Sequence, residues 1–262
     1  MFQLLLSFFL VGSAYGAEIQ TVKTVAGEMH TGYLGIGDID ALDYLPLKTD
    51  NQTLPDSFDW RTVEGIVTKP KNQGQCGSCV SFATMGMLES AAAIHGQTGL
   101  DLSEQNMLDC RSGDAFGCNG AYLSAAGYTT NGVSGEEIYP YKGRRGRCQS
   151  LEKAAKSEKA VIIGSPGRRP TADQIKKALI DYGPLMVSVY AGGSGWSGRT
   201  GRVTSCRRTS SSNHAILLVG YNKDGWIFKN SWGTSWGAKG FSEIGYGCDG
   251  FGSEAVALLL DK

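Results

Sequence analysis

The sequence predicts an α+β fold of two lobes with a cleft between them. Helical periodicity dominates the first half of the chain, where the apolar residues Val80, Ala83, Met87, Ala91 and Ile94 recur at steps of three and four. The second half consists of short β-branched and aromatic runs, which are typical of strands. Helices and strands are therefore segregated along the chain, as expected for an α+β protein.

Three helices are expected from local signals. The first follows Cys79 and ends in "GQTG". The second begins in "LSEQNMLDC", where Ser103 is a suitable N-cap. In the third, Thr171 and Gln174 fit a capping box, and the Gly-Pro pair at 183–184 ends the helix.

Strand-like runs follow the third helix: "LMVSVY", "AILLVGY", "GWIFKNSW", "FSEIGY" and "EAVALLL". Asp224-Gly225 is a hairpin turn signal between the second and third runs. Neighbouring runs joined by such a turn pair in opposite directions. An antiparallel sheet is therefore expected.

The composition and the first residues indicate the compartment. The chain has 262 residues, and its 25 basic and 25 acidic side chains leave a formal net charge of zero, so neither nucleic acid nor an anionic membrane is an expected partner. The apolar run Leu4–Val11 is too short to span a bilayer and leads into the small residues "SAYGA". We interpret residues 1–16 as a secretory signal peptide. No later segment is long and apolar enough for a membrane span, so a soluble protein of the secretory pathway is expected.

Residues 17–53 differ from the rest of the chain. They contain neither cysteine nor tryptophan, and they carry an N-glycosylation sequon at Asn51. Aromatic residues, cysteines and clear periodicity begin with "LPDSFDWR" at Leu54. We therefore interpret residues 17–53 as a short pro-segment and residues 54–262 as the folded domain. An N-terminal arm that is never removed is the alternative.

The cysteine count is odd. Cysteines occur at seven positions, namely Cys76, Cys79, Cys110, Cys118, Cys148, Cys206 and Cys248. In an oxidising compartment three pairs would leave one free reactive thiol or one intermolecular bridge, and the sequence does not tell which cysteine is odd. Half a zinc site and a redox pair are weak alternatives for Cys76-x-x-Cys79, because no second pair has matching spacing and no βαβ unit is indicated.

Cys79 is a candidate nucleophile. A thiol ionises more readily at a helix N-terminus, and the first predicted helix begins there, so its dipole should favour the thiolate. His214 opens a predicted strand and is the candidate base, since the other two histidines lie in the presumed pro-segment and at the far end of the first helix. Asn230 lies on the next strand and can accept the imidazole N–H, and Trp232 on the same face can shield that bond from water.

These residues belong to the motifs "NQGQCGSC", "LSEQNMLDC", "GCNGAY", "IYPY", "NHAILLVGY" and "KNSWGTSWG". The motifs occur in the order and spacing of papain and the cysteine cathepsins, so the chain resembles the papain family from about Leu54 to its C-terminus. The resemblance implies a papain-like fold with a mainly helical lobe (about 54–165), a mainly β lobe (about 166–262) built as an antiparallel, barrel-like sheet, and an active-site cleft between them.

The resemblance also implies a role for individual residues. Cys79 would be the nucleophile, His214 the general acid–base and Asn230 the residue that orients it. Gln73 resembles the family's oxyanion donor, acting with the Cys79 backbone N–H. The implied substrate-binding residues are Gly120, Ala121, Tyr122, Leu123, Ser188, Asn213, Trp232 and Glu254. The implied disulfides are Cys76–Cys118, Cys110–Cys148 and Cys206–Cys248, which leave Cys79 free.

The implied function is hydrolysis of internal peptide bonds through an acyl-enzyme thioester, by an enzyme made as a secretory proenzyme. Its partners would be protein or peptide substrates and cystatin-like inhibitors. No metal or organic cofactor is implied. A monomer is expected, in a lysosome-like compartment or outside the cell.

The sequence departs from the papain-family pattern at two positions, one in the helix that begins at Cys79 and one in the stretch expected to pair with the substrate. Val80 stands where the family has Trp, which leaves volume to fill but removes no catalytic group. Ala121 stands where the family has a glycine that pairs with substrate, and alanine fits if its φ is negative. The presumed pro-segment also lacks the long charged helix typical of cathepsin L-like zymogens. A papain-like shell kept only for binding is the alternative function.

Specificity is expected to rest on the pocket for the second residue before the scissile bond. "GFGSEAV" resembles the stretch of cathepsin B in which a glutamate closes this pocket, which would make Glu254 the floor and basic as well as apolar residues acceptable. Asp249 looks like an insertion, and a register shift of one would place Ser253 there instead. No histidine-containing occluding loop is present between Cys118 and Cys148, which favours endopeptidase action.

Overall fold

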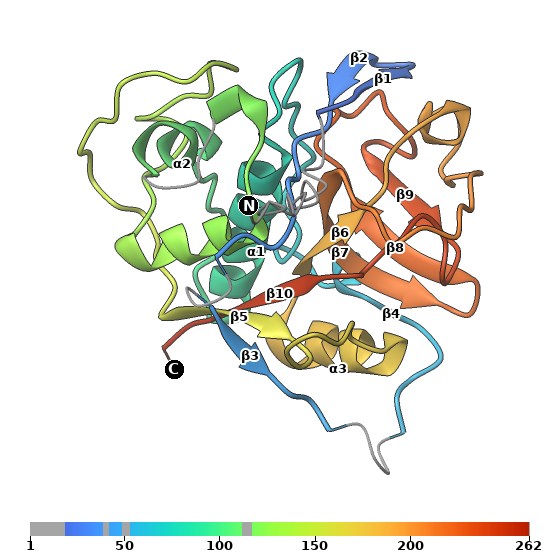
Figure 1. Ribbon diagram of the computed structural model, residues 1–262. Helices are drawn as coiled ribbons and strands as arrows, with labels where there is room; N and C mark the ends of the chain where they lie inside the picture. Colours follow the sequence, from blue (N-terminus) through green and yellow to red (C-terminus); the bar gives the residue numbers. More distant parts are fainter. Residues whose placement is uncertain (1–18, 39–41, 49–52, 112–116, 262) are drawn as a thin grey trace, which may run out of the picture.

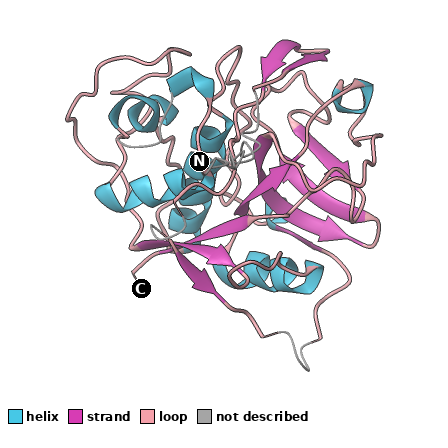
Figure 2. Cartoon of the chain, viewed as in Figure 1, coloured by secondary structure: helices cyan, strands magenta, loops and turns pink. Residues whose placement is uncertain are grey.

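The computed structural model describes residues 19–38, 42–48, 53–111 and 117–261. Helices α1 and α2 lie in one lobe, and most of a β-sheet together with α3 forms the other (Figure 1, Figure 2), so the predicted α+β fold is confirmed. Within these ranges the helices are α1 (Cys79–Ile94), α2 (Glu104–Cys110), α3 (Ala172–Tyr182) and the 3₁₀ helices η2 (Trp60–Thr62), η3 (Gly117–Asn119), η4 (Leu123–Asn131) and η5 (Ser194–Trp196). The strands are β1 (Thr21–Thr24), β2 (Gly27–His30), β3 (Asp43–Leu45), β4 (Phe58–Asp59), β5 (Lys159–Ile163), β6 (Leu185–Val189), β7 (His214–Asn222), β8 (Gly225–Lys229), β9 (Phe241–Ile244) and β10 (Ala255–Leu259).

Helix α1 lies at the centre of the molecule (Figure 1), and it is more buried than its apolar stripe suggests. All its residues except Ile94 are buried, so the expectation of one core-facing side is too narrow. It contacts α2 and η4 of the helical lobe and also β6, β7 and β10 of the sheet. Val80 is fully buried in an apolar cluster with Met85 and Leu88. Dense packing on every side fixes the position of the first residue, Cys79.

The main sheet has eight strands in the order β3-β5-β10-β6-β7-β8-β9, with β4 paired to β7. The expected antiparallel pairing holds for every pair in it except β3 with β5, which is parallel. Over the described residues the sheet is open, with β3 and β9 at its ends. The expected barrel-like closure is therefore wrong.

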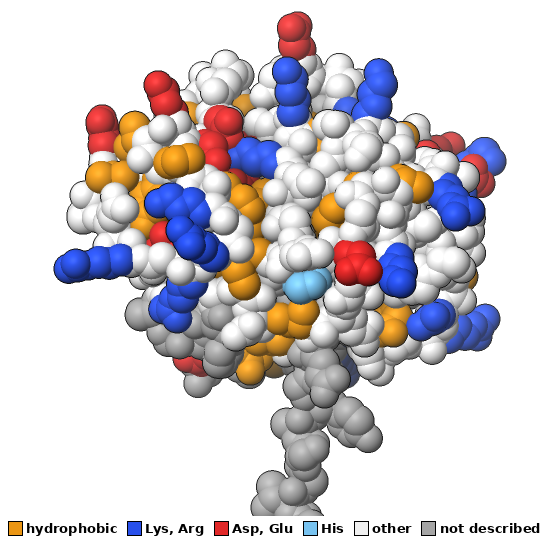
Figure 3. All heavy atoms as spheres, turned by 90° about the horizontal axis from the view of Figure 1, so that it is seen from above, with side chains coloured by type: hydrophobic (Ala, Val, Ile, Leu, Met, Phe, Trp, Pro, Cys, Tyr) orange, Lys and Arg blue, Asp and Glu red, His pale blue; other side chains and the backbone are white. Residues whose placement is uncertain are grey.

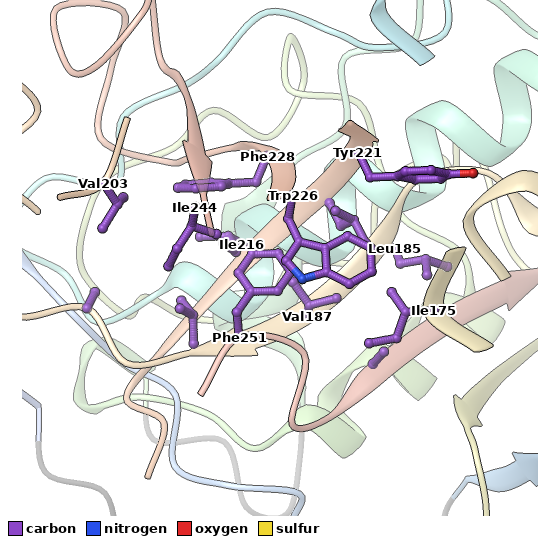
Figure 4. Packing of buried hydrophobic residues seen from close by; sticks show 14 of the residues in the cluster. Ile175, Leu185, Val187, Val203, Ile216, Tyr221, Trp226, Phe228, Ile244 and Phe251 are labelled. Atoms are coloured by element: carbon purple, nitrogen blue, oxygen red, sulfur yellow. The ribbon is translucent and has the colours of Figure 1, made fainter. Parts of the chain in front are cut away.

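Large apolar side chains fill the core of the β lobe (Figure 4). The rings of Trp226 and Phe251 stack with centroids 5.7 Å apart. Ile175 of α3 and Leu185 of β6 are buried in the same cluster. Burying a side chain of this size contributes about 1.5–3 kcal/mol, so the cluster holds α3 and the central strands together and gives β7 and β8 a firm support.

The predicted helix caps are confirmed. Ser103 Oγ accepts a hydrogen bond from the backbone N–H of Asn106 at 2.9 Å, at the start of α2. Thr171 and Gln174 form the capping box of α3, each side chain accepting from the other residue's backbone N–H, at 3.2 and 2.9 Å. The predicted hairpin joins β7 to β8. Each of these signals is local, which is why a short stretch of sequence suffices to read it.

The six paired cysteines form Cys76–Cys118, Cys110–Cys148 and Cys206–Cys248. The first two lie in the helical lobe and the third in the β lobe. Cys79 is a free, buried thiol. Cys76 and Cys79 are therefore not a redox pair in this structure.

The described parts of the N-terminal segment (residues 19–38 and 42–48) pack against the domain that follows them. Strands β1 and β2 form a hairpin, whose Val22 and Met29 are buried in the β-lobe core cluster. From there the chain passes between the two lobes, as Figure 1 shows in blue, and ends as strand β3. The Leu45 carbonyl accepts from Gly164 N at 3.0 Å. No strands were expected in this segment, because its sequence pattern is weak without the pairing strands.

Residues 1–16, interpreted as a signal peptide, and the sequon residue Asn51 lie outside the described residues. Within the described ranges, no helix is long and apolar enough to cross a membrane.

Candidate active site

The thiol of Cys79 lies at the first residue of α1, where the unbonded backbone N–H groups of the helix converge. Its side chain has no solvent exposure. Ser78 precedes it, and the Ser78 hydroxyl lies 2.7 Å from the hydroxyl of Tyr141. The same tyrosine hydroxyl donates to the Gln73 carbonyl at 3.0 Å. These contacts tie the loop before the helix to the helical lobe.

The imidazole of His214 is held from the other lobe by the β7–β8 hairpin. The register pairs Leu217 with Lys229, which places Asn230 diagonally across from His214 on one face of the sheet. Nε2 of His214 lies 2.9 Å from Oδ1 of Asn230, so Nε2 carries the proton and donates it to the amide oxygen. The Trp232 ring stacks on the imidazole with centroids 4.8 Å apart. Nδ1 is buried and has no hydrogen-bond partner among the described residues.

The Gln73 amide lies beside the loop that carries the thiol, and its three bonds fix its orientation. Nε2 donates to the Cys76 carbonyl at 2.8 Å and to the His30 carbonyl at 2.9 Å, while Oε1 accepts from Ser231 Oγ at 2.6 Å. The N–H group expected to serve a substrate oxyanion is therefore bonded to a carbonyl of the N-terminal segment. Gln73 is 1% exposed.

Burial disfavours the charged form of both reactive groups in this structure. Burial raises the pKa of the Cys79 thiol to about 12, although hydrogen bonds from the backbone at Ala215, Val80 and Gly32 oppose the shift. Burial likewise lowers the pKa of His214 to about 4, with the Asn230 bond opposing it. The sequence led us to expect a thiolate stabilised by the helix dipole. In this structure desolvation opposes that ionisation and outweighs the backbone hydrogen bonds that favour it.

The backbone of residues 32–34 forms hydrogen bonds to both lobes, to Asn213 on one side and to Ala121 on the other. On one side the backbone N–H groups of Gly32 and Tyr33 donate to the Asn213 carbonyl at 3.0 and 2.9 Å. On the other, Ala121 N donates to the Gly32 carbonyl at 2.8 Å and Leu34 N donates to the Ala121 carbonyl at 3.0 Å, which makes a parallel bridge. Ala121 does not have a positive φ, so its Cβ is compatible with this pairing.

Only glycine fits at position 32. A Cβ built there would lie 2.1 Å from the backbone oxygen of Gly77, two residues before Cys79. The φ of Gly32 is not in the left-handed region, so the restriction is steric and comes from the opposite wall of the cleft. The wall at Gly120 is also tight, because a Cβ there would lie 2.8 Å from the Gly32 oxygen.

The carboxylate of Glu254 faces the segment in the cleft. Burial and the neighbouring Glu254 raise the pKa of Tyr33 well above its ordinary value. Tyr33 is 2% exposed and packs in one cluster with Leu123 and, at its edge, Ala121. Ser188 Oγ donates to the Glu254 carboxylate and lies 3.0 Å from the Glu254 backbone N. Ser253 is engaged elsewhere, since its hydroxyl donates to the Gly250 carbonyl at 2.7 Å.

The remaining predicted residues surround the same cleft. The Asn213 side chain bonds to both backbone groups of Ala191 and to Gln20 of the N-terminal segment. Tyr122 precedes η4, and position 37 of the N-terminal segment packs against it, since a Cβ on Gly37 would lie 2.4 Å from the Tyr122 Cβ. No three His, Cys, Asp or Glu side chains gather as a metal site within the described ranges.

Sequence reasoning missed the structural role of Asp249. It is fully buried with φ 47°, and it accepts hydrogen bonds from Trp196 Nε1 at 2.9 Å, Arg207 N at 2.7 Å and the Ser205 hydroxyl. The carboxylate thus holds the loop around η5 against the β lobe. No sequence signal identified this role, because its partners lie more than forty residues away in the chain.

The buried thiol lies at a helix N-terminus beside the backbone of Ala215, the residue that follows an imidazole oriented by an amide. This arrangement is typical of proteins with a thiol nucleophile. A family model described as "Papain family cysteine protease" matches residues 54–258. The chain belongs to the papain family of cysteine proteases, whose peptidase members are hydrolases, and the family resemblance is thereby confirmed.

Curated relatives agree with the family model. The chain is 37% identical over 205 residues to "Cathepsin L-like" of Caenorhabditis elegans, covering 74% of this chain and 60% of that protein. It is 37% identical over 201 residues to "Cathepsin S" of Bos taurus, covering 73% and 60%. The chain thus matches about three fifths of the length of these relatives.

Solved structures show the same fold. A cysteine protease of Carica candamarcensis in complex with E-64 matches with a TM-score of 0.70 and 32% identity, covering 80% of this chain and 100% of that one. Procathepsin L 3 of Tenebrio molitor matches with a TM-score of 0.72 and 30% identity, covering 83% and 74%.

Proposed function

We propose that the protein is a cysteine endopeptidase made as a latent secretory proenzyme. The observation that carries the proposal is the single unbridged cysteine, Cys79, at the head of α1, together with the His214–Asn230 bond at the facing hairpin. A structural cysteine would need neither a helix N-terminus nor an oriented imidazole.

The proposed reaction begins when the cleft is open. Nδ1 of His214 takes the Cys79 proton, and the sulfur attacks the carbonyl carbon of the scissile bond. Negative charge develops on the carbonyl oxygen, where the Cys79 backbone N–H and Gln73 Nε2 can donate to it. Protonated Nδ1 then gives its proton to the leaving nitrogen as the C–N bond breaks. Water, deprotonated by the same nitrogen, attacks the thioester, and the C–S bond breaks to release the acid and the thiol.

Asn230 would act on this cycle through His214. Its Oδ1 accepts the Nε2 proton, which leaves Nδ1 as the nitrogen that exchanges protons. Trp232 covers that bond, so water does not compete for it.

The N-terminal segment supports the proposal of latency. Its backbone pairs with Ala121 and Asn213 on both sides of the cleft, and the His30 carbonyl uses the Gln73 N–H that a substrate would need. The neutral, buried state of Cys79 and His214 follows from this cover. We therefore assign residues 17–53 as a pro-segment and residues 54–262 as the peptidase domain.

We further propose that Glu254, not Ser253, closes the pocket for the second residue before the scissile bond. The support is that Glu254 faces Tyr33, while the Ser253 hydroxyl bonds to Gly250. A carboxylate in a partly enclosed pocket favours Arg or Lys as well as apolar residues. Cystatin-like inhibitors, a monomeric state and a lysosome-like or extracellular location are proposals that rest on the family.

The direct test is gelatin zymography of the wild-type chain beside Cys79→Ala, after removal of the N-terminal segment by an added protease in both samples. We expect clearing by the wild type and none by the variant. Absence of clearing in both lanes, from folded protein, would favour the alternative of a binding module.

A further inference from the structure

Lys229, the last residue of β8, is a buried cation one residue before Asn230. Basic side chains on the face in Figure 3 project from the surface, but Lys229 is only 8% exposed. Its side chain lies against α1, since a Cβ added to Gly86 would be 3.2 Å from Lys229 Nζ. Burial lowers the pKa of Lys229, while the carboxylates of Glu89 and Glu104 oppose the shift. A buried cation costs free energy of folding, and the proposed reaction gives this one no step.

A chain of hydrogen bonds connects Lys229 to the helix that carries the thiol. Lys229 Nζ donates to Thr68 Oγ1 at 2.8 Å and to the Thr68 carbonyl at 3.3 Å. Thr68 Oγ1 in turn donates to Oε2 of Glu89 at 2.5 Å. Glu89 lies on α1, the helix that begins at Cys79, and it is 2% exposed. The cation of the β lobe is therefore bonded, through one hydroxyl, to the helix of the candidate nucleophile.

A second lysine binds the same acidic side chains. Lys71 Nζ lies 3.6 Å from Oε1 of Glu89 and 3.0 Å from Oε1 of Glu104, the first residue of α2. Two residues further on, Gln73 N donates to the Ser231 carbonyl at 2.8 Å. The stretches that carry the two lysines are thus bonded to each other as well as to the helices. We call the following residues the buried charge cluster: Lys71, Glu89, Glu104 and Lys229.

A glycine on α1 makes room for Lys229. Gly86 lies in the interior of the helix, where glycine costs about 0.5–1 kcal/mol relative to alanine. A Cβ at this position would meet Leu217 Cδ2 at 3.1 Å and Lys229 Nζ at 3.2 Å. Helix stability is therefore reduced at the point where α1 receives the lysine. Such a local cost is typical of functional positions.

The amide of Asn230 depends on its backbone for its place. Oδ1 accepts from the N–H of its chain neighbour Ser231 at 2.8 Å and from the imidazole of His214 at 2.9 Å. Nδ2 is buried and has no hydrogen-bond partner among the described residues. Apart from the bond to the imidazole, the amide thus has no described bond beyond its own neighbour. The backbone from Lys229 to Ser231 therefore determines where the amide lies.

We propose that Glu89 and Lys229 are positioning residues of the active site. They hold the backbone at Asn230, and with it the imidazole of His214, in a fixed place relative to the thiol on α1. The inference rests on the proposed function and adds two residues to its machinery. Stability alone does not account for the cluster, because uncharged groups of similar shape often replace a buried ion pair without loss of stability.

The size of the effect follows from the geometry of the reaction. A displacement of about 1 Å at a reacting group can cost roughly 100-fold in rate. We expect a smaller displacement here, because Trp232 still stacks on the imidazole. The expected loss is therefore roughly 10-fold in kcat, without a change in KM, since substrate binding is left intact.

The test removes both charges together, in the chain freed of its N-terminal segment. In Lys229→Met/Glu89→Gln, the glutamine amide can accept from Leu102 N and donate to Thr68 Oγ1, so these two groups keep a partner. We expect a melting temperature equal to that of the wild type or higher. For a Phe-Arg peptide, kcat should fall roughly 10-fold at unchanged KM. A folded double variant with wild-type kcat overturns the proposal.

Lys177→Met/Asp181→Asn is the matched control, because it also removes one charge of each sign. The two residues form an ion pair of 2.6 Å on the surface of α3, and this variant should keep the wild-type kcat. If Lys229→Met/Glu89→Gln does not fold, Gly86→Ala decides. Its Cβ displaces the flexible end of Lys229 without removing a charge, so kcat should fall at unchanged KM. An unchanged kcat in Gly86→Ala then overturns the proposal.

The proton on Nε2 of His214 reports its position without any catalysis. In the intact chain the ring is fully buried and this proton is bonded to Asn230, so its magnetic resonance signal should exchange slowly with water. Exchange should be roughly 10-fold faster in Lys229→Met/Glu89→Gln, and equal exchange in the two proteins overturns the proposal. Failure of the proposed function is distinct, because the processed wild type then cleaves no peptide while the proton still responds to the double variant.

Discussion

The peptidase domain and the N-terminal segment are held by different forces, although both contribute strands to one sheet. The domain has three disulfides and two apolar clusters. The segment from Thr31 to Ile36 is held by backbone hydrogen bonds to Asn213, Ala121 and their neighbours and by the buried side chain of Tyr33, and it is covered by no disulfide. Hydrogen bonds that can be exchanged for bonds to water have a small net value, about 0.5–1.5 kcal/mol each. We therefore expect the segment to leave the cleft while the domain stays folded.

The largest expected effect comes from Gly32→Val. Its Cβ would collide with the Gly77 backbone, which cannot move without shifting the start of α1. Overpacking of this kind costs about 1–3 kcal/mol, so the open fraction should rise roughly 5- to 150-fold. Initial hydrolysis of a Phe-Arg peptide by the unprocessed chain measures this, with intact mass confirming that no cleavage has occurred.

Val25→Ala is the control for Gly32→Val, because Val25 is exposed in the hairpin turn and should leave latency unchanged. Equal latency of Gly32→Val and the wild type would show that residue 32 does not lie against Gly77 in solution.

The next effect is a pH dependence. Burial lowers the pKa of His214 to about 4, below its ordinary 6.5, so the closed state holds the ring neutral. A depressed pKa contributes stability that is complete above pH 6.5 and is lost as the pH falls towards 4. Acid should therefore favour release of the segment, roughly tens-fold between pH 7.5 and 4.5 if the ring has an ordinary pKa in the open state. Hydrogen exchange of residues 31–36, corrected for intrinsic rates, measures the shift.

His214→Gln tests the origin of this pH dependence, since glutamine does not titrate. The variant should keep its segment protected at pH 4.5. An acid opening of equal size in the variant would assign the effect to another group, such as Glu254.

The smallest expected effect comes from a substitution of Glu254, which lies near Tyr33 in the closed cleft and would face the substrate in the open one. In Glu254→Ser, hydrolysis of an Arg-Arg peptide relative to a Phe-Arg peptide should fall roughly tenfold, because one charge-assisted hydrogen bond is lost. Glu158→Ser removes an exposed carboxylate and should leave the ratio unchanged. An unchanged ratio in Glu254→Ser would indicate that Ser253, and not Glu254, forms the floor of the pocket.

Local signals made the peptidase domain predictable. Ser103 and Thr171 act within three residues of their own positions, and the start of α1 at Cys79 follows from a short apolar pattern. The odd cysteine count indicated a free thiol or an intermolecular bridge but not which cysteine was odd, and the family resemblance was needed to choose Cys79. The pairing of the other six cysteines could not be read from residue spacing alone, because the two cysteines of each disulfide are about forty residues apart.

What escaped prediction depends on distant partners. Strand β3 exists because β5 offers it an edge, and its own sequence carries too weak a pattern. The neutral state of Cys79 also escaped, because the helix dipole is visible in the sequence while the cover by Gly32 and its neighbours is not. The open sheet differs from the expected barrel for a similar reason, since closure depends on pairing between strands that are distant in sequence.

The central claim is that residues 31–36 cover a peptidase nucleophile. The most direct measurement is the rate at which a thiol-directed epoxide labels Cys79 at pH 7, in the intact chain and after removal of the N-terminal segment. Because burial holds the thiol pKa near 12 in the closed state, labelling should be on the order of 100-fold slower in the intact chain. Equal rates, or no labelling of the processed chain, would contradict the account.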